Sequence, residues 1–197
     1  MVGREETSGD QSVWLLKARR FGDTRGWFEE TFSDKRMQSL GIDLRFVQDN
    51  QSFSAGAGTL RGIHFQRPPF AQAKLVRCVR GRILDVAVDL RRGSPTFGNV
   101  VSAELTAAVG EQLFVPVGFG HGFVTLEPDC EVAYKVSAPY APECEGGIIW
   151  NDPDIGIDWP VPDGGPVLSA KDLELPALAT FDSPFTYTGG PLQLLNA

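Results

Sequence analysis

The chain of 197 residues carries 18 Lys and Arg against 25 Asp and Glu, and this net charge of −7 disfavours nucleic acid as a partner because phosphates would be repelled. Its 22 Gly and 14 Pro disfavour a helical bundle, since both residues interrupt helices. The length fits one domain. With no apolar run near the roughly 20 residues of a membrane span, no signal peptide and three Cys without C-x-x-C spacing, we expect a cytoplasmic protein with reduced thiols and no membrane partner.

In the first part of the chain, turn residues alternate with short apolar segments. Residues 1–12 are polar and are expected to form a flexible tail, so that 13–197 make up a single domain. Ser33 is a suitable N-cap and Gly41 a suitable C-terminal stop, which together predict a short helix over 33–40. The other expected elements are a strand over 13–16, a loop over 21–27, an extended segment beginning at 46–47 and a hairpin-like connection over 54–62.

The middle of the chain is its most regular part. Apolar runs flanked by Gly, Pro, Asp or Asn predict strands over 75–79, 83–90, 100–105, 112–115, 122–126 and 131–136. From Trp150 the chain is rich in Pro and Gly but is punctuated by large apolar residues, which indicates an ordered crossing loop. Ser169 is expected to cap a short terminal helix. Short strands at this spacing favour a mainly β fold with a few short helices, either a sandwich, a jelly roll or a barrel.

The segment from Gly110 to His121 has the spacing G-x5-P-x-G-x2-H. This spacing resembles the second sequence motif of the cupin superfamily, whose fold is a jelly roll, or double-stranded β-helix. In this resemblance, Pro116 and Gly118 set a turn, and His121 then starts a strand that points into the barrel. The strand pattern agrees with this fold.

The region of the first cupin motif reads Arg61-Gly-Ile-His64-Phe-Gln66. Many cupins hold a metal with two His and a Glu from this motif and one His from the second. Here Gln66 stands where the second His is expected, no acid follows before Asp85, and Lys74 lies in the stretch of the carboxylate. Two His beside a cationic lysine make a poor site for a divalent metal, so we expect none, and the His are free for acid–base chemistry.

A longer series of motifs carries a more specific resemblance. In order along the chain these motifs are FGDTRGWFEE from Phe21, QDN from Gln48, RGIHFQ from Arg61, AQAKLV from Ala71, GSPTFG from Gly93, the His121 motif, Tyr134-Lys135, WNDP from Trp150 and SAKD from Ser169. The series resembles the dTDP-4-dehydrorhamnose 3,5-epimerase family over about residues 13–175. Members of that family invert C3 and C5 of a dTDP-linked 4-keto-6-deoxyhexose and use no cofactor, which the resemblance implies here too.

The resemblance also implies catalytic roles. Both carbons lie α to the C4 ketone, so removal of a proton gives an enolate with its charge on the C4 oxygen. His64 matches the family's base and Asp172 the carboxylate paired with it. Tyr134 matches the acid on the opposite face of the sugar, and Lys74 matches the cation near the C4 oxygen.

Other positions match residues that bind the substrate in the family. Arginine suits the diphosphate because its planar guanidinium can contact two oxygens at once, and an aromatic ring suits thymine. In the family the segment 25–30 often reaches the neighbouring subunit's site, which implies a homodimer with shared active sites. The matching positions are Arg25, Trp27, Phe28, Glu30, Gln48, Asn50, Arg61, His121, Tyr140, Glu145 and Lys171.

Two departures from the family pattern concern binding rather than catalysis. Phe53 stands where a basic residue is common, and Ala138-Pro139-Tyr140 replaces a segment with an aromatic pair, of which only Tyr140 is left.

Three alternatives stay open: an enzyme that inverts only C3 or only C5 of a dTDP-4-keto sugar, a non-catalytic cupin that binds a sugar nucleotide, and a metal-dependent cupin oxygenase. Without the resemblance, Tyr134 would be interpreted as a packing residue, which is the usual role of a tyrosine in a strand.

Overall fold

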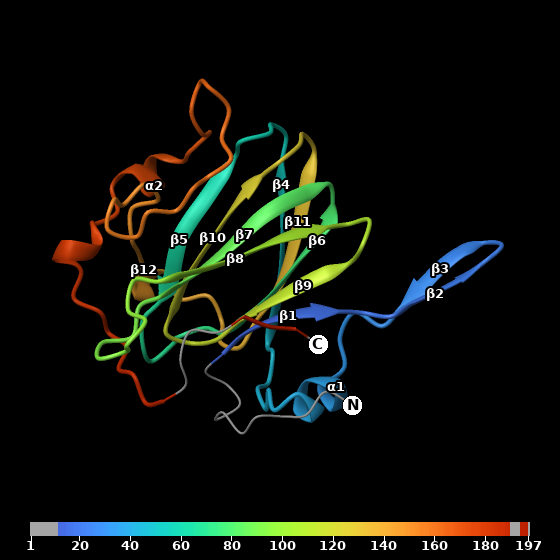
Figure 1. Cartoon of the computed structure of the whole chain (residues 1–197). Coiled ribbons are helices and arrows are strands. Elements are labelled where there is room, and N and C mark those ends of the chain that lie inside the picture. The colour runs from blue at the N-terminus through green and yellow to red at the C-terminus, as the bar shows by residue number, and fades with distance from the viewer. Residues whose placement is uncertain (1–11, 190–193, 197) are drawn as a thin grey trace.

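The computed structural model describes residues 12–189 and 194–196, which fold into two facing β-sheets and a projecting hairpin (Figure 1). The six-stranded sheet has the order β13 (Leu194–Asn196), β1 (Val13–Lys17), β9 (Glu111–Val115), β6 (Lys74–Arg80), β11 (Cys130–Val136) and β4 (Gln48–Ser54). The five-stranded sheet has the order β12 (Glu145–Gly147), β5 (Leu60–Gln66), β10 (Phe119–Thr125), β7 (Arg82–Asp89) and β8 (Val100–Thr106). The short helices are α1 (Asp34–Ser39) and α2 (Ala170–Leu173), with 3-10 turns at Pro142–Cys144 and Leu178–Thr180.

The chain passes repeatedly from one sheet to the other, as in a jelly roll. From β8 onward it alternates, with β9 and β11 in the six-stranded sheet and β10 in the five-stranded sheet. All strand pairs are antiparallel apart from β1 with β13. The predicted mainly β jelly roll is therefore confirmed.

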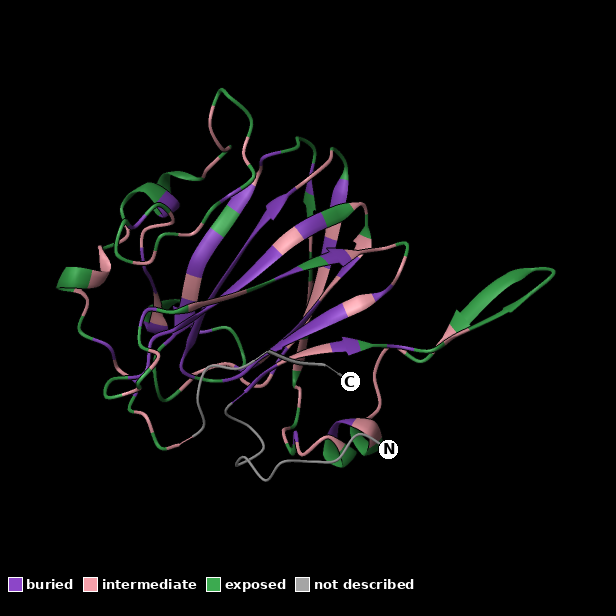
Figure 2. Ribbon diagram, in the orientation of Figure 1, coloured by how far each residue is buried: buried purple, intermediate pink, exposed green. Residues whose placement is uncertain are grey.

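The main core lies between the two sheets. Val76, Leu113 and Val132 from the six-stranded sheet pack with Ile83 and Phe123 from the five-stranded sheet. Strand β10 is buried along its whole length because β5 and β7 flank it and both of its faces are covered (Figure 2). Burial on both faces removes the in–out alternation of a half-exposed strand, so the sequence of β10 does not alternate between apolar and polar residues.

Two further clusters cover the outer faces of the sheets. Helix α1 places Met37 against Leu75 and Phe114 on the outside of the six-stranded sheet. The C-terminal segment places Trp159 and Phe185 against the outside of the five-stranded sheet. The loop that begins at Trp150 is thus an ordered crossing, as predicted, because its large apolar residues fill this layer.

The predicted strands and helices of the chain are confirmed, with ends that move by a few residues. Ser33 caps α1 by accepting a hydrogen bond from the Arg36 N–H, and Gly41 follows the helix with φ +81°. Ser169 caps α2 in a reciprocal capping box with Asp172. Of the tail predicted over 1–12, residues 1–11 lie outside the described residues.

Two predictions about connections were wrong. The segment 21–27 is not a loop, because β2 (Arg20–Asp23) and β3 (Gly26–Glu29) pair as a hairpin. Both strands are mostly exposed, so they lack the buried face that gives a strand its apolar signal. The segment 54–62 does not join two strands of a hairpin, since β4 and β5 belong to different sheets and the chain crosses between them.

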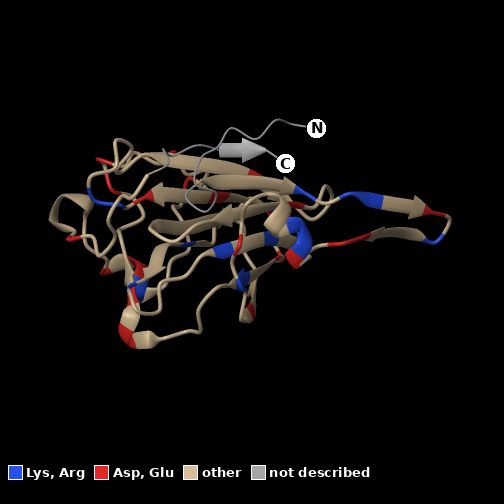
Figure 3. Cartoon of the chain, turned by 90° about the horizontal axis from the view of Figure 1, so that it is seen from below, with Lys and Arg blue, Asp and Glu red and all other residues tan. Residues whose placement is uncertain are grey.

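The β2–β3 hairpin extends away from the sheets in two perpendicular views (Figures 1 and 3). Its base is fixed by Arg20, which donates hydrogen bonds to Glu29 at 2.7 Å and to the Ala107 carbonyl at 2.8 Å. The arm beyond this base has no other strand of the described chain beside it. Within the described residues, no helix is long and apolar enough to cross a membrane.

Candidate active site

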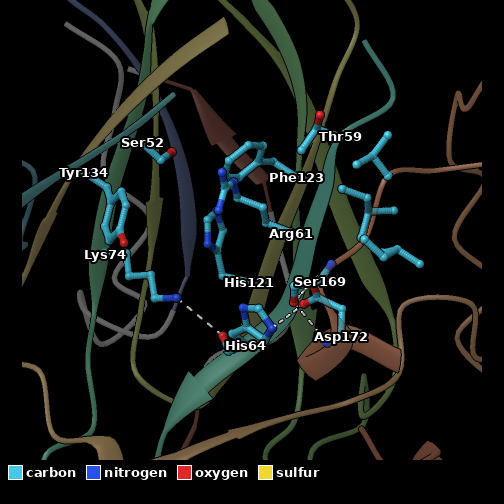
Figure 4. A pocket seen from close by; sticks show the side chains of 13 residues that line it. Ser52, Thr59, Arg61, His64, Lys74, His121, Phe123, Tyr134, Ser169 and Asp172 are labelled. Carbon is cyan, nitrogen blue, oxygen red and sulfur yellow. Dashed lines mark hydrogen bonds and ion pairs between the residues drawn. The ribbon is translucent and has the colours of Figure 1, made fainter. Parts of the chain in front are cut away.

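A pocket of about 400 Å³ opens between the two sheets (Figure 4). Its walls come from β4, β5, β6, β10 and β11, and the segment that leads into α2 closes one side. The polar residues that line it are Ser52, Thr59, Arg61, His64, Lys74, His121, Tyr134, Ser169 and Asp172. Six of the residues predicted for the site are therefore brought together in one cavity.

Pairing between β5 and β10 places the two histidines side by side. His64 is the direct partner of His121 in this antiparallel ladder, and the register shifts just after His121. The two strands approach so closely that a Cβ atom at Gly62, where φ is +141°, would lie 2.5 Å from the Gly122 Cα. Glycine at both positions permits this close approach, and the side chains of His64 and His121 line the same pocket.

His64 is held by Asp172 at the start of α2. The His64 Nε2 atom lies 2.7 Å from Asp172 Oδ1, and the two side chains are 36% and 3% exposed. Ser169 Oγ donates a hydrogen bond of 2.6 Å to the other carboxylate oxygen. Burial raises the pKa of Asp172, but the hydrogen bonds from His64 and Ser169 outweigh it and lower the pKa to about 2. A carboxylate that stays ionised orients the imidazole and stabilises its protonated form.

His121 has a carboxylate partner of its own, which was not predicted as a site residue. Its Nε2 atom lies 2.7 Å from Oδ1 of Asp85 on β7, and both side chains are buried. Burial lowers the pKa of His121, although Asp85 opposes this effect. In the sequence Asp85 is visible only as the first acid after the His64 motif, inside an apolar run that indicates core.

Lys74 lies at the start of β6 and faces both histidines. Its ammonium group donates to the His64 carbonyl at 3.4 Å. Burial lowers the pKa of Lys74 to about 8, and the negative charges of Asp85 and Glu145 limit the fall. An ammonium group that is poorly solvated interacts more strongly with a developing negative charge than an exposed one does.

Tyr134 faces the histidines from the opposite sheet. It comes from β11, next to Lys74 on β6, whereas His64 and His121 come from β5 and β10 (Figure 4). Burial raises the pKa of the Tyr134 phenol, with Arg61 acting in the other direction. The hydroxyl is therefore protonated at neutral pH and available as a proton donor.

The other predicted binding residues lie outside this cavity. Gln48 donates to Asn50 at 2.8 Å and accepts from the Tyr140 N–H at 3.0 Å, while Glu145 forms an ion pair with Lys171. The hairpin arm holds three of the predicted residues and Glu30 follows directly after it: Arg25, Trp27, Phe28 and Glu30. The structure does not bring these four into the pocket of their own chain.

Gln66, at the position of the expected second metal ligand, has a structural task. Its amide donates to the carbonyls of Phe70 and Pro139, at 2.7 and 3.1 Å, and accepts from the Ala141 N–H at 2.9 Å. The side chain thus joins the segments that contain Phe70 and residues 139–141. In the part of the chain that the structure describes, no group of three or more His, Cys, Asp or Glu is placed to hold a metal ion.

The pocket of this jelly roll combines a His–Asp pair, a buried lysine and a facing tyrosine. These groups are the ones that a cupin-type isomerase needs in order to transfer protons. The chain belongs to the dTDP-4-dehydrorhamnose 3,5-epimerase family, whose model matches residues 10–180. It is 53% identical over 175 residues to the dTDP-4-dehydrorhamnose 3,5-epimerase of Sinorhizobium fredii NGR234, and the match covers 89% of each chain.

Solved structures give the same result. The dTDP-4-dehydrorhamnose 3,5-epimerase of Bacillus anthracis, with TDP and PPi bound, matches with a TM-score of 0.81 and 49% identity over 83% of this chain and 93% of that one. The dTDP-6-deoxy-D-glucose-3,5-epimerase of Legionella pneumophila, in complex with dTDP-4-keto-L-rhamnose, matches with a TM-score of 0.81 and 43% identity, covering 85% and 88%. The chain is accordingly an epimerase of the isomerase class.

Proposed function

We propose that this protein inverts C3 and C5 of dTDP-4-dehydro-6-deoxy-D-glucose and releases dTDP-4-dehydro-L-rhamnose, without a metal or another cofactor. The observation that carries the proposal is the position of His64 and Tyr134, which enter one pocket from opposite sheets with Lys74 beside them. Inversion needs a base on one face of the ring and an acid on the other, and this arrangement supplies both.

His64 acts as the base in this mechanism. Because its Nε2 atom faces Asp172, Nδ1 carries the free electron pair towards the pocket. Nδ1 takes the proton from C3 or C5, and the electrons of the broken C–H bond move into the bond to C4 and onto the C4 oxygen. The ammonium group of Lys74 stabilises the resulting enolate.

Tyr134 completes each inversion from the other face. Its hydroxyl gives a proton to the same carbon as the enolate electrons form the new C–H bond. The step leaves a tyrosinate and a protonated His64, which return to their starting forms by exchanging protons with solvent. The second carbon then reacts in the same way, since both carbons are α to the same ketone.

Incubation with the 4-keto sugar in deuterated water, followed by NMR, tests this function. We expect deuterium at both C3 and C5, and loss of incorporation in His64→Ala. Label at one carbon only would assign the chain to the single-carbon epimerases. Binding of dTDP without any incorporation would make it a non-catalytic sugar-nucleotide-binding protein, and loss of activity on chelation would support a metal enzyme.

We further propose a homodimer in which each hairpin arm completes the partner's nucleotide site. In the arm, the exposed fractions of Trp27 and Phe28 are 58% and 69%. Neighbouring exposed aromatic residues of this kind are typical of a surface that binds another protein. Isolated two-stranded hairpins are marginally stable, so a partner surface for this arm is expected. The partner's Arg25 would then bind the substrate diphosphate together with Arg61.

The cytoplasmic location stays a prediction.

Complementation between two inactive variants tests the shared site. Arg25→Ala removes the arm's cation and His64→Ala removes the base, so each homodimer should be inactive. Refolding the two variants together at equal amounts should form about half heterodimers, each with one intact site, and restore about a quarter of wild-type activity. No recovery in a mixture proven to contain heterodimers would show that arm and base act within one chain.

A further inference from the structure

Asp85 is a buried carboxylate that the mechanism above does not use. It lies in β7 opposite Phe123 of β10, with 0% of its surface exposed. One oxygen contacts His121 Nε2 at 2.7 Å, whereas Oδ2 has no hydrogen-bond partner among the described residues. A buried carboxylate oxygen without a partner is costly, so stability alone does not account for an acid at this place.

The negative charge of Asp85 acts on the buried ammonium group of Lys74. Burial pulls the pKa of Lys74 down to about 8, and the charges of Asp85 and, less strongly, Glu145 resist this. Glu145 is itself paired with Lys171, whose opposite charge weakens its field, and both of these side chains are partly exposed. Asp85 is fully buried, so its field is poorly screened by solvent.

We propose that Asp85 is a positioning residue for the epimerisation: one of its oxygens orients His121, and its buried negative charge supports the positive charge of Lys74 that stabilises the enolate. The proposal rests on the proposed function for the role of the enolate. The contact between Asp85 and His121 and the electrostatic influence of Asp85 on Lys74 do not depend on that function.

The same contact fixes what His121 can offer to the sugar. Its Nε2–H donates to Asp85, and burial keeps the pKa of the ring below its ordinary value. His121 is then neutral at physiological pH and presents the electron pair of Nδ1 to the pocket. It accepts a hydrogen bond from a sugar hydroxyl, and Lys74 supplies the positive charge for the C4 oxygen.

Several elements contribute a charged or titratable group to the surroundings of Lys74. The groups are His64 and Arg61 from β5, Asp85 from β7, His121 from β10, Tyr134 from β11, Glu145 from β12 and Asp172 from α2. Asp172 is already paired with His64 and hydrogen-bonded to Ser169. The second oxygen of Asp85 has no hydrogen-bond partner among residues 12–189 and 194–196, so its charge remains available to balance Lys74.

The pH profile of deuterium incorporation tests the proposal through Asp85→Asn, which keeps the shape and removes the charge. Wild-type activity should fall as the pH rises through about 8, where Lys74 loses its proton. In the variant this fall in activity at alkaline pH, the basic limb of the profile, should move to lower pH. A pKa lowered by one unit would leave about threefold less protonated Lys74 at pH 7.5.

Asp152→Asn is the matched control. Asp152 is 2% exposed and accepts hydrogen bonds from the N–H groups of Asp154 and Leu178, away from the pocket. Its substitution should lower stability and leave the basic limb in place. Asp85→Glu keeps the charge but lengthens the side chain, so we expect a lower rate with an unchanged limb. An Asp85→Glu limb shifted to lower pH would overturn the role of the charge, even if Asp85→Asn fails to fold.

A second readout needs no substrate. Acetic anhydride labels free amines, and tryptic peptides that contain Lys74 carry no other lysine up to Arg77. At pH 7 the labelling of Lys74 should increase about fivefold in Asp85→Asn for a pKa lowered by one unit. Unchanged labelling overturns the inference while leaving the epimerase function intact. Absence of deuterium incorporation in the wild type overturns the proposed function but not this coupling.

Discussion

Replacing Lys74 with Met should make the protein more stable while it removes activity. Lys74 lies among protein atoms at the pocket wall, and its pKa falls from the ordinary 10.5 to about 8 because burial disfavours the ammonium form. That fall corresponds to about 3 kcal/mol. Since the side chain also borders an open pocket, we expect a smaller gain of about 1–3 kcal/mol for Lys74→Met at pH 7.

The pH dependence distinguishes this cause from better packing. The folded protein binds the Lys74 proton less tightly than the unfolded chain does, so the penalty is complete below about pH 8. It fades as the pH rises towards 10.5, where the unfolded chain loses the proton too. The advantage of Lys74→Met should therefore shrink between these two pH values.

Urea denaturation of both proteins at pH 7, 9 and 10.5 measures the effect. Lys35→Met on the exposed face of α1 is the control and should change the free energy of unfolding by less than about 0.5 kcal/mol. A Lys74→Met protein that is less stable than the wild type at pH 7, or an advantage that does not vary with pH, would refute the reasoning.

Three further predictions concern the same site. Asp172→Asn should reduce deuterium incorporation about 10²- to 10⁴-fold, as measured by NMR, because His64 loses the group that orients it. Because the pKa of Asp172 is lowered to about 2, its stabilising effect should be present above about pH 4 and be lost as the pH falls towards 2, so urea midpoints of wild type and Asp172→Asn should converge there. Gly122→Ala should lower the free energy of unfolding by about 1–3 kcal/mol, since its Cβ would lie 2.9 Å from the Arg61 carbonyl oxygen; an unchanged urea midpoint would contradict the close approach.

The two sheets could be predicted because their strands carry the signal in their own residues. Short apolar runs with turn residues at each end marked β6 to β11, and the burial of those residues between sheets explains why the pattern was clear. The caps Ser33 and Ser169 were predictable for the same local reason. The motif residues His64, Lys74, His121, Tyr134 and Asp172 were found through the family resemblance and share one pocket.

The missed features depend on contacts that local sequence does not encode. Asp85 sits in a strand that is apolar on both sides of it, and only the pairing of β7 with β10 shows that it meets His121. The hairpin has no buried face in its own chain, so neither its strands nor its aromatic residues give the alternation of a core strand. The crossing between β4 and β5 depends on which sheet each strand joins, and the turn residues alone allow a hairpin there.

The two His–Asp pairs differ in exposure, and this difference supports their proposed division of labour. An epimerase base must release each proton it takes before the next cycle, so its ring needs a route to water. The His64 side chain is 36% exposed while its carboxylate is only 3% exposed, which gives a ring that can exchange protons on a fixed support. The His121 side chain is 8% exposed and its carboxylate 0%, so a proton placed there has no comparable exit. Burial also lowers the pKa of His121, which favours an acceptor that holds the sugar while His64 performs the proton transfers.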